Sequence, residues 1–224
     1  RLVPVALSLP RLEGAYDPTT SAVIYDGGKA RLKEAFDGLD FEHLDVEKDD
    51  AQKRLAALIK GATAVVAAVG NRQPGLPRYL HKGAELITGA IKESGSAPRL
   101  VVLSSFGIGD DFVPKGAITF IWKTMLSTVN RSARTDLQGL EATVASAGGD
   151  HLLVRTVGIG DEQEPKGQWV ILTGPGAVEL NMCKEDVAQF MLDEALRPTY
   201  HSTAVTIGAV PVPKGKGKGK AGST

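Results

Sequence analysis

The sequence has little cysteine, no excess of charge of either sign and no long hydrophobic run. Its one cysteine, Cys183, excludes an internal disulfide and indicates a reducing compartment, and we expect it to be a packing residue. Lys and Arg number 26 and Asp and Glu number 26, so no net field draws the chain to nucleic acid or acidic lipid. No stretch approaches the ~20 apolar residues of a membrane-spanning helix. We therefore expect no nucleic-acid partner and no membrane span, with any membrane contact made through a partner protein.

Two patterns that form ligand sites are missing as well. The four histidines are scattered along the chain without the spacing of metal ligands. No G-x-x-G-x-x-G run stands ahead of the buried-strand candidates. Such a glycine loop lines a helix N-terminus and holds the pyrophosphate of a dinucleotide. The sequence therefore predicts no metal site and no pyrophosphate-binding loop of the usual kind.

From residue 21 onward, short apolar runs alternate with amphipathic stretches. This alternation predicts an α/β fold, a Rossmann-like doubly wound and mostly parallel sheet with helices on both faces. Strands are expected at 21–25, 41–46, 63–69, 99–105, 152–155, 168–172 and 203–207. Helices are expected at 29–36, 49–59, 80–94, 118–126, 135–147 and 185–196. The runs 63–69 and 99–105 are continuously apolar, which predicts adjacent parallel strands buried on both faces.

The length of 224 residues fits one domain, which we expect over 1–210. The tail 211–224 contains a run in which glycine and lysine alternate, and it is expected to be disordered because it can bury nothing. The chain begins with Arg1 rather than Met, which we interpret as processing or truncation. An organellar stroma or matrix is the expected location, and the cytoplasm is the alternative.

The first residues admit two interpretations. In one, 2–9 forms the opening strand, and 10–20 replaces both the glycine loop and the helix that normally follows it. In the other, Leu2, Val3, Ala6 and Leu7 form one face of that helix, and the strand and glycine loop lie upstream of the chain. Pro4 is tolerable only near a helix start. In both interpretations, the residues of this sequence provide no glycine-lined helix N-terminus for a phosphate.

Several short motifs, in their order and spacing, resemble those of a known family. They are Asp26-Gly-Gly-Lys29, Leu44-Asp-Val46, 65–70, 100–105, Asp136 with Glu141, 153–155 and 184–192. Together they resemble the NmrA-like, NAD(P)-binding type of atypical short-chain dehydrogenases, over about residues 21–208. That group includes flavin and biliverdin reductase-like proteins, sensors, assembly factors and an accessory subunit of respiratory complex I.

The resemblance implies positions for a dinucleotide. Asp26 would accept hydrogen bonds from the adenine ribose, Asp45 and Val46 would flank the adenine, and Gly70 would end the turn under the adjacent ribose. Tyr25 stands where the family often has a basic residue for a 2′-phosphate, which argues against an NADP preference. The alternative for the two aspartates is that they cap a turn or helix at a strand end.

The same resemblance places a second group of residues at the nicotinamide side. Ser104 and Ser105 end the central strand, at the carboxyl edge where open α/β sheets bind ligands. Thr156 and Val157 stand in place of the family's Arg-Pro turn, whose backbone faces the nicotinamide amide. The alternative for the serines is a strand terminus whose hydrogen bonds are satisfied within the protein.

Classical members of this superfamily also use a Tyr-x-x-x-Lys pair to pass a proton during hydride transfer. Here the corresponding positions fall near Ser132 and Asp136, and no tyrosine in the chain is followed four residues later by lysine. We therefore expect no catalytic residue of the classical kind, and a cofactor that is absent or is weakly bound NAD(P)H.

Two functions remain open. The favoured one is a non-catalytic accessory or scaffold subunit, bound to other protein subunits in a larger organellar complex, photosynthetic or respiratory. The alternative is an NAD(P)H-dependent reductase of the flavin or quinone type.

Overall fold

The computed structural model describes residues 5–8, 42–45, 48–69, 79–108, 131–160, 165–173 and 182–210. The predicted strand 21–25, the predicted helices 29–36 and 118–126, and the predicted tail 211–224 all lie outside these residues. Whether 1–210 forms one domain therefore stays a prediction.

A five-stranded sheet forms the centre of the fold, in the order β3-β4-β5-β9-β7. Its parallel strands are β3 (Ala64–Ala67), β4 (Arg99–Ser105), β5 (His151–Thr156) and β9 (Thr203–Gly208). The edge strand β7 (Val170–Leu172) pairs antiparallel with β9. This arrangement confirms the prediction of a mostly parallel sheet.

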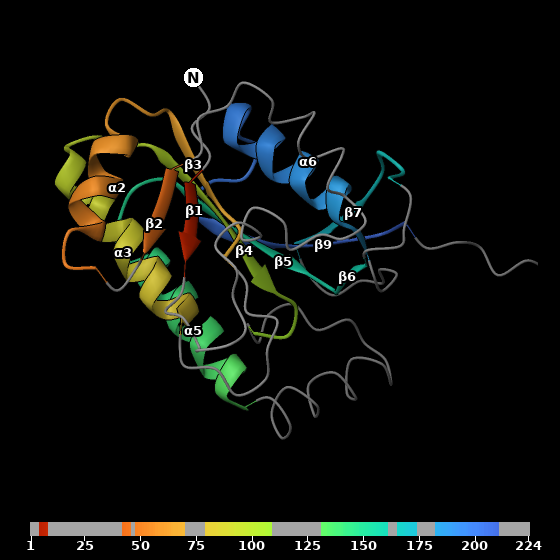
Figure 1. Cartoon of the computed structure of the whole chain (residues 1–224). Coiled ribbons are helices and arrows are strands. Elements are labelled where there is room, and N and C mark those ends of the chain that lie inside the picture. The colour runs from red at the N-terminus through yellow and green to blue at the C-terminus, as the bar shows by residue number, and fades with distance from the viewer. Residues whose placement is uncertain are drawn as a thin grey trace, which may run out of the picture.

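Helices cover both faces of this sheet, as Figure 1 shows. On one face lie α2 (Ala51–Ile59), α3 (Tyr79–Ser94) and α5 (Arg131–Ser146), and on the other lies α6 (Lys184–Leu196). Each face has its own apolar core, because side chains of a strand point alternately to the two sides. The doubly wound architecture is thereby confirmed.

The first residues form a strand rather than a helix. β1 (Val5–Ser8) pairs in parallel with β2 (Glu42–Asp45) in a separate two-stranded sheet. The interpretation that the chain opens with a strand is therefore confirmed over Val5–Ser8, and the helical one is wrong; the part of it that concerns 10–20 lies outside the described residues. Leu44 of β2 is fully buried in the same core as α2 and α3, so β2 belongs to the packed body of the fold.

Some boundaries and burials differ from expectation. β3 and β4 are adjacent and parallel as predicted, but β3 is only partly buried, with Val66 39% exposed. The physical reason is that β3 lies at an edge of the five-stranded sheet within the part that the structure describes. α5 begins at Arg131, four residues before the predicted start at 135. The earlier start was not predicted because the first turn of the helix has no apolar stripe.

Two very short strands were not predicted. β6 (Ile159–Gly160) pairs in parallel with β8 (Met182–Cys183), and two residues are too few to carry a periodic pattern. Cys183 is 2% exposed, which confirms it as a packing residue. Burial, together with the hydrogen bond that its thiol donates to Glu185, raises the pKa of Cys183.

A charged network closes the amino-terminal edge of the sheet. Arg99, which begins β4 and is 6% exposed, donates from Nε to the Glu194 carbonyl at 2.9 Å and from Nη2 to the Glu194 carboxylate at 3.2 Å. It also pairs with Asp150, whose carboxylate lies 2.9 Å from Nδ1 of His201. These contacts join β4, the end of α6 and the loops that precede β5 and β9.

Among the helices that the structure describes, none has both the length and the apolar character needed to cross a membrane.

Candidate functional site

The carboxyl ends of β4 and β5 bring four of the predicted site residues together. In the parallel register, Ser104 lies opposite Arg155 and Ser105 lies opposite Thr156. The pairing continues past the strands, because the Phe106 N–H donates to the Thr156 carbonyl at 2.9 Å. Ser104, Ser105, Thr156 and the next residue, Val157, thus form one continuous edge, at the place where open α/β sheets bind ligands.

Ser104 is committed to a contact within the protein. Its hydroxyl donates to Oε1 of Glu141 at 2.6 Å, and its side chain is 4% exposed. Glu141 of α5 also accepts two hydrogen bonds from Arg155, at 2.9 Å from Nε and 2.6 Å from Nη2. Arg155 and Glu141 are both buried, so the two charges compensate each other in a region that excludes water.

Ser105 is in a different position. Its side chain is half-buried, and its hydroxyl makes only a long contact of 3.4 Å to the Phe106 carbonyl. Of the two serines, Ser105 therefore has the hydroxyl that can turn toward a ligand at low cost. Thr156 and Val157 are 5% and 2% exposed, so any contact that they make to a ligand runs through the backbone or a small exposed part of the side chain.

Both strands end in a turn that requires glycine. Gly107 has φ 85° and Gly158 has φ 102°, values in the left-handed region that side chains disfavour. The Gly158 carbonyl accepts the Met182 N–H at 3.0 Å, which ties this turn to β8 and so to the start of α6. The backbone around the edge is therefore fixed by the fold.

The proton-transfer pair of classical relatives has no equivalent on α5. That helix reads RSARTDLQGLEATVAS and contains neither tyrosine nor lysine. Ser132 is exposed on the first turn. Asp136 is buried, and its two carboxylate oxygens accept the backbone N–H groups of Leu80 at 3.0 Å and His81 at 2.9 Å. Asp136 thus caps the N-terminus of α3 and has no freedom to act as an acid or base at the sheet edge.

Sequence reasoning missed the roles of Arg155 and Asp186. Asp186, in the first turn of α6, accepts the N–H groups of Lys166 at 3.0 Å and Gly167 at 2.9 Å, and so holds the segment before β7. A signal was present for Arg155, because a charged residue inside a buried apolar strand needs a buried partner. For Asp186 there was no signal, since an acidic residue in a first helical turn is common on any surface helix.

The adenine side of the predicted site lies mostly outside the described residues. Asp26, Val46 and Gly70 belong to that part of the chain. Asp45 is the last residue of β2, opposite Ser8 of β1, so its predicted place at a strand end is confirmed. The cofactor roles of all eight predicted residues, including those at the carboxyl edge, stay predictions.

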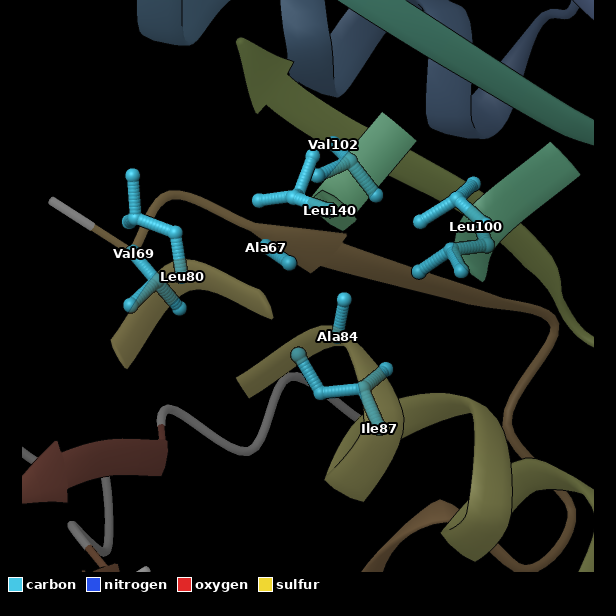
Figure 2. Close-up of a pocket in the computed structure, with 9 residues that line it drawn as sticks. Ala67, Val69, Leu80, Ala84, Ile87, Leu100, Val102 and Leu140 are labelled. Atoms are coloured by element: carbon cyan, nitrogen blue, oxygen red, sulfur yellow. The ribbon is translucent and has the colours of Figure 1, made fainter. Parts of the chain in front are cut away.

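An apolar crevice lies between the sheet and the helices α3 and α5 (Figure 2). It is lined by Ala67, Val69, Leu80, Ala84, Ile87, Leu100, Val102, Leu140 and Val144. No polar side chain lines it, so it offers nothing to orient a dinucleotide and belongs to the core. The described part of the chain also holds no cluster of His, Cys, Asp and Glu able to bind a metal.

Comparison with known families agrees with this geometry. Residues 21–198 match the family described as NAD(P)H-binding, which is most of the chain. The protein therefore belongs to the NAD(P)H-binding family, and the resemblance to NmrA-like atypical short-chain dehydrogenases is confirmed.

Solved structures share the fold at low sequence identity. A short-chain dehydrogenase/reductase from Veillonella parvula, solved with NADP, superposes with a TM-score of 0.61 at 13% identity, over 81% of this chain and 79% of its own. A candidate NAD-dependent epimerase/dehydratase from Bacillus halodurans gives 0.61 at 15% identity, over 94% and 84%. A candidate NADH-flavin reductase from Streptococcus pneumoniae gives 0.53 at 17% identity, over 93% and 100%. Comparison with curated protein sequences gives no match.

Proposed function

We propose that the protein is a non-catalytic accessory or scaffold subunit built on an NAD(P)H-binding fold. The observation that carries this proposal is the position of Asp136. At the point on α5 where classical relatives place an ionisable catalytic side chain, this chain has a carboxylate that holds two backbone N–H groups of α3. Because those bonds stabilise the packing of α5 on α3, the residue contributes to the body of the fold rather than to proton transfer.

Two further features support the same proposal. Ser104, the serine that would assist the missing pair, donates its hydroxyl to Glu141 inside the protein. The sequence also lacks the glycine loop that neutralises pyrophosphate charge. The proton-transfer pair and the glycine loop are thus missing and Ser104 is engaged within the protein, while the described residues form a five-stranded sheet with an apolar core on each face. The partners of such a subunit would be other protein chains of a larger assembly.

A turnover assay tests this proposal. NADH and NADPH oxidation is followed with FMN, FAD and a soluble quinone as acceptors, with and without the purified chain. We expect rates equal to those of the protein-free mixture. Saturable turnover that disappears on heat denaturation would contradict the scaffold role.

A second candidate function is an NAD(P)H-dependent reductase of the flavin or quinone type. It is favoured by the family match and by Ser105, whose hydroxyl remains available at the sheet edge. A reductase of this kind relies on placing the cofactor next to the acceptor and needs no Tyr-x-x-x-Lys pair. In the same assay, turnover that survives Ser132→Ala and falls with Ser105→Ala would establish this function.

A further inference from the structure

α6 has apolar side chains on its outer face as well as on the face that packs against the sheet. Val187, Phe190 and Met191 are buried in the core beneath the helix. On the outer side, Leu192 is 40% exposed and Leu196 is 73% exposed. A helix that covers a sheet normally keeps its outer face polar or charged, whereas a helix that is apolar all round is normally covered. The outer face of α6 therefore has the character of a contact surface.

The other described helices lack this feature. Among the helices that the structure describes, α6 is the one that exposes large apolar side chains. On the other side of the sheet, α3 presents four charged residues to solvent, Lys82, Glu85, Lys92 and Glu93. A single exposed leucine needs no explanation, but two leucines four residues apart on one helix lie next to each other and form a patch.

The exposed residues of α6 are ordered along the helix. Ala188, Leu192 and Leu196 are all exposed and stand four residues apart, so they form a stripe about 12 Å long, here named the α6 stripe. A small side chain lies at one end of the α6 stripe and a large one at the other. Exposed charges of opposite sign flank it, with Glu185 before it and Arg197 after it.

We propose that the α6 stripe is the contact surface of a dimer, in which it packs antiparallel against the α6 stripe of a second copy of this chain. The two-fold axis passes through Leu192, so each Leu192 meets its own copy. Ala188 lies four residues before Leu192 and Leu196 lies four residues after it, so Ala188 faces Leu196 of the partner subunit. The small side chain leaves room for the large one at both ends of the contact.

The flanking charges select the same arrangement. In the antiparallel pair, Glu185 lies near Arg197 of the partner subunit, so opposite charges meet at both ends. A parallel pair would place like charges together at both ends. Arg197 donates a hydrogen bond to Asp193 at 2.7 Å, and its guanidinium has further N–H donors for a second carboxylate. A different protein chain as partner would not require the α6 stripe to be complementary to itself.

The contact is small, because one helix face from each copy buries less surface than the ~1,600 Å² of a standard stable interface. We therefore expect a reversible dimer with a dissociation constant on the order of 10 μM. Self-association needs no cofactor and no other subunit, so the inference goes beyond the proposed function. Its failure would leave the scaffold role untouched.

Sedimentation velocity of the purified full chain, from about 1 μM to about 500 μM, tests the dimer. The wild type should change from monomer to dimer across this range. Leu192→Arg should raise the dissociation constant about tenfold or more, because two like charges then meet at the two-fold axis. The matched control is Ala142→Arg, which adds the same charge at an exposed position of α5, on the other side of the sheet. The control should dimerise as the wild type does.

Two results of this experiment would overturn the proposal. One is a wild type that stays monomeric at every concentration, which would leave the α6 stripe to a different partner. The other is a dimer that Leu192→Arg and Ala142→Arg affect equally. Circular dichroism and thermal melting check that both variants fold.

A charge exchange tests the antiparallel arrangement without altering the apolar residues. Glu185→Arg or Arg197→Glu alone should raise the dissociation constant about threefold to tenfold, because each change brings like charges together at both ends of the contact. The double variant restores opposite charges and should dimerise nearly as well as the wild type. A double variant that dimerises no better than the two single variants would overturn the arrangement.

Disulfide cross-linking measures the register independently. The one natural cysteine, Cys183, is buried, so the added thiol is the accessible one. Leu192→Cys should form a covalent dimer on mild oxidation. Ala188→Cys should cross-link to Leu196→Cys in a mixture of the two variants but not to itself, because its two copies would lie ~12 Å apart along the helix axis. Failure of Leu192→Cys to cross-link, or equal cross-linking of all pairs, would contradict this register.

Discussion

Asp136 lies against the N-terminus of a neighbouring helix, where its Oδ2 atom accepts the Leu80 N–H at 3.0 Å. The other oxygen accepts the next N–H, that of His81, at 2.9 Å. An acidic side chain is well placed there, because the first N–H groups of a helix have no partner within the helix and carry the positive end of its dipole. The contact explains why α5 and α3 pack as one unit, and it removes Asp136 from any role at the sheet edge.

Replacing Asp136 with alanine should lower the free energy of unfolding by about 2 kcal/mol, because two buried N–H groups lose their acceptor. Urea denaturation measures this loss. The matched control is Ser132→Ala on the same helix, whose exposed side chain should change stability by less than about 0.5 kcal/mol. Equal stability of the two variants would show that Asp136 does not cap α3.

The contact between Glu141 and Arg155 predicts strong coupling. Glu141→Leu or Arg155→Met alone should each cost about 3–5 kcal/mol, because each removes one half of a buried ion pair. The double variant should recover most of that loss, since two apolar side chains then replace the pair. A double-mutant cycle from denaturation curves gives the coupling energy. Additive losses would mean that the charges are compensated elsewhere.

Two helical glycines, Gly139 and Gly89, lie close to a side chain of a neighbouring helix, and we expect them to differ in how well they tolerate replacement by alanine. A Cβ on Gly139 would lie 2.7 Å from Cγ and 3.2 Å from Cβ of His81, the stiff base of that side chain. A Cβ on Gly89 would lie 2.5 Å from Oε1 of Gln52, the mobile end of a long side chain. Gly139→Ala should therefore lower the melting temperature by several degrees, as expected for a loss of ~1–3 kcal/mol.

Gly89→Ala serves as the comparison. It should leave the melting temperature unchanged or raise it, because alanine favours the helix once Gln52 moves aside. His81→Ala should restore tolerance to Gly139→Ala. A Gly139→Ala variant as stable as the wild type would show that α3 and α5 are farther apart than described.

Acid should weaken the amino-terminal edge of the sheet. Partial burial alone would raise the pKa of Asp150, but hydrogen bonds from Arg99 and His201 outweigh it and hold that pKa below its usual value. A lowered pKa stabilises the fold above the unfolded value of about 4 and loses that contribution as the pH falls through the folded value. The free energy of unfolding should therefore decline below about pH 4, and the decline should be shallower in Asp150→Asn. Identical pH profiles for the two proteins would contradict this.

The architecture could be predicted from the sequence because burial determines where apolar residues stand. Strands covered on both faces, β4 and β5, are continuous apolar runs, and α3, covered on one face, has apolar residues at helical spacing. The edge position of β3 was missed because a continuous apolar run does not reveal how many neighbours a strand has. The strands β6 and β8 were missed because two residues carry no period. Two-residue strands depend on contacts that form only when the turn after β5 meets the start of α6.

The candidate site was predictable in place but not in detail. The strand-end positions of Ser104 and Ser105 follow from the pattern of β4, and the structure confirms them. The difference between the two serines was not predictable, because it depends on Glu141, which is far from them in sequence. The loss of the Tyr-x-x-x-Lys pair was visible at once, but the capping role of Asp136 became visible only when α3 and α5 were placed together.

The most direct test of the scaffold role is calorimetric titration of the purified 224-residue chain with NADH and NADPH. A dinucleotide normally needs the backbone N–H groups of a glycine loop to cancel its pyrophosphate charge, and no such loop is present in this sequence. We therefore predict binding in the millimolar range or weaker for both cofactors. A dissociation constant in the low micromolar range for either one would contradict the account and favour the reductase in its place.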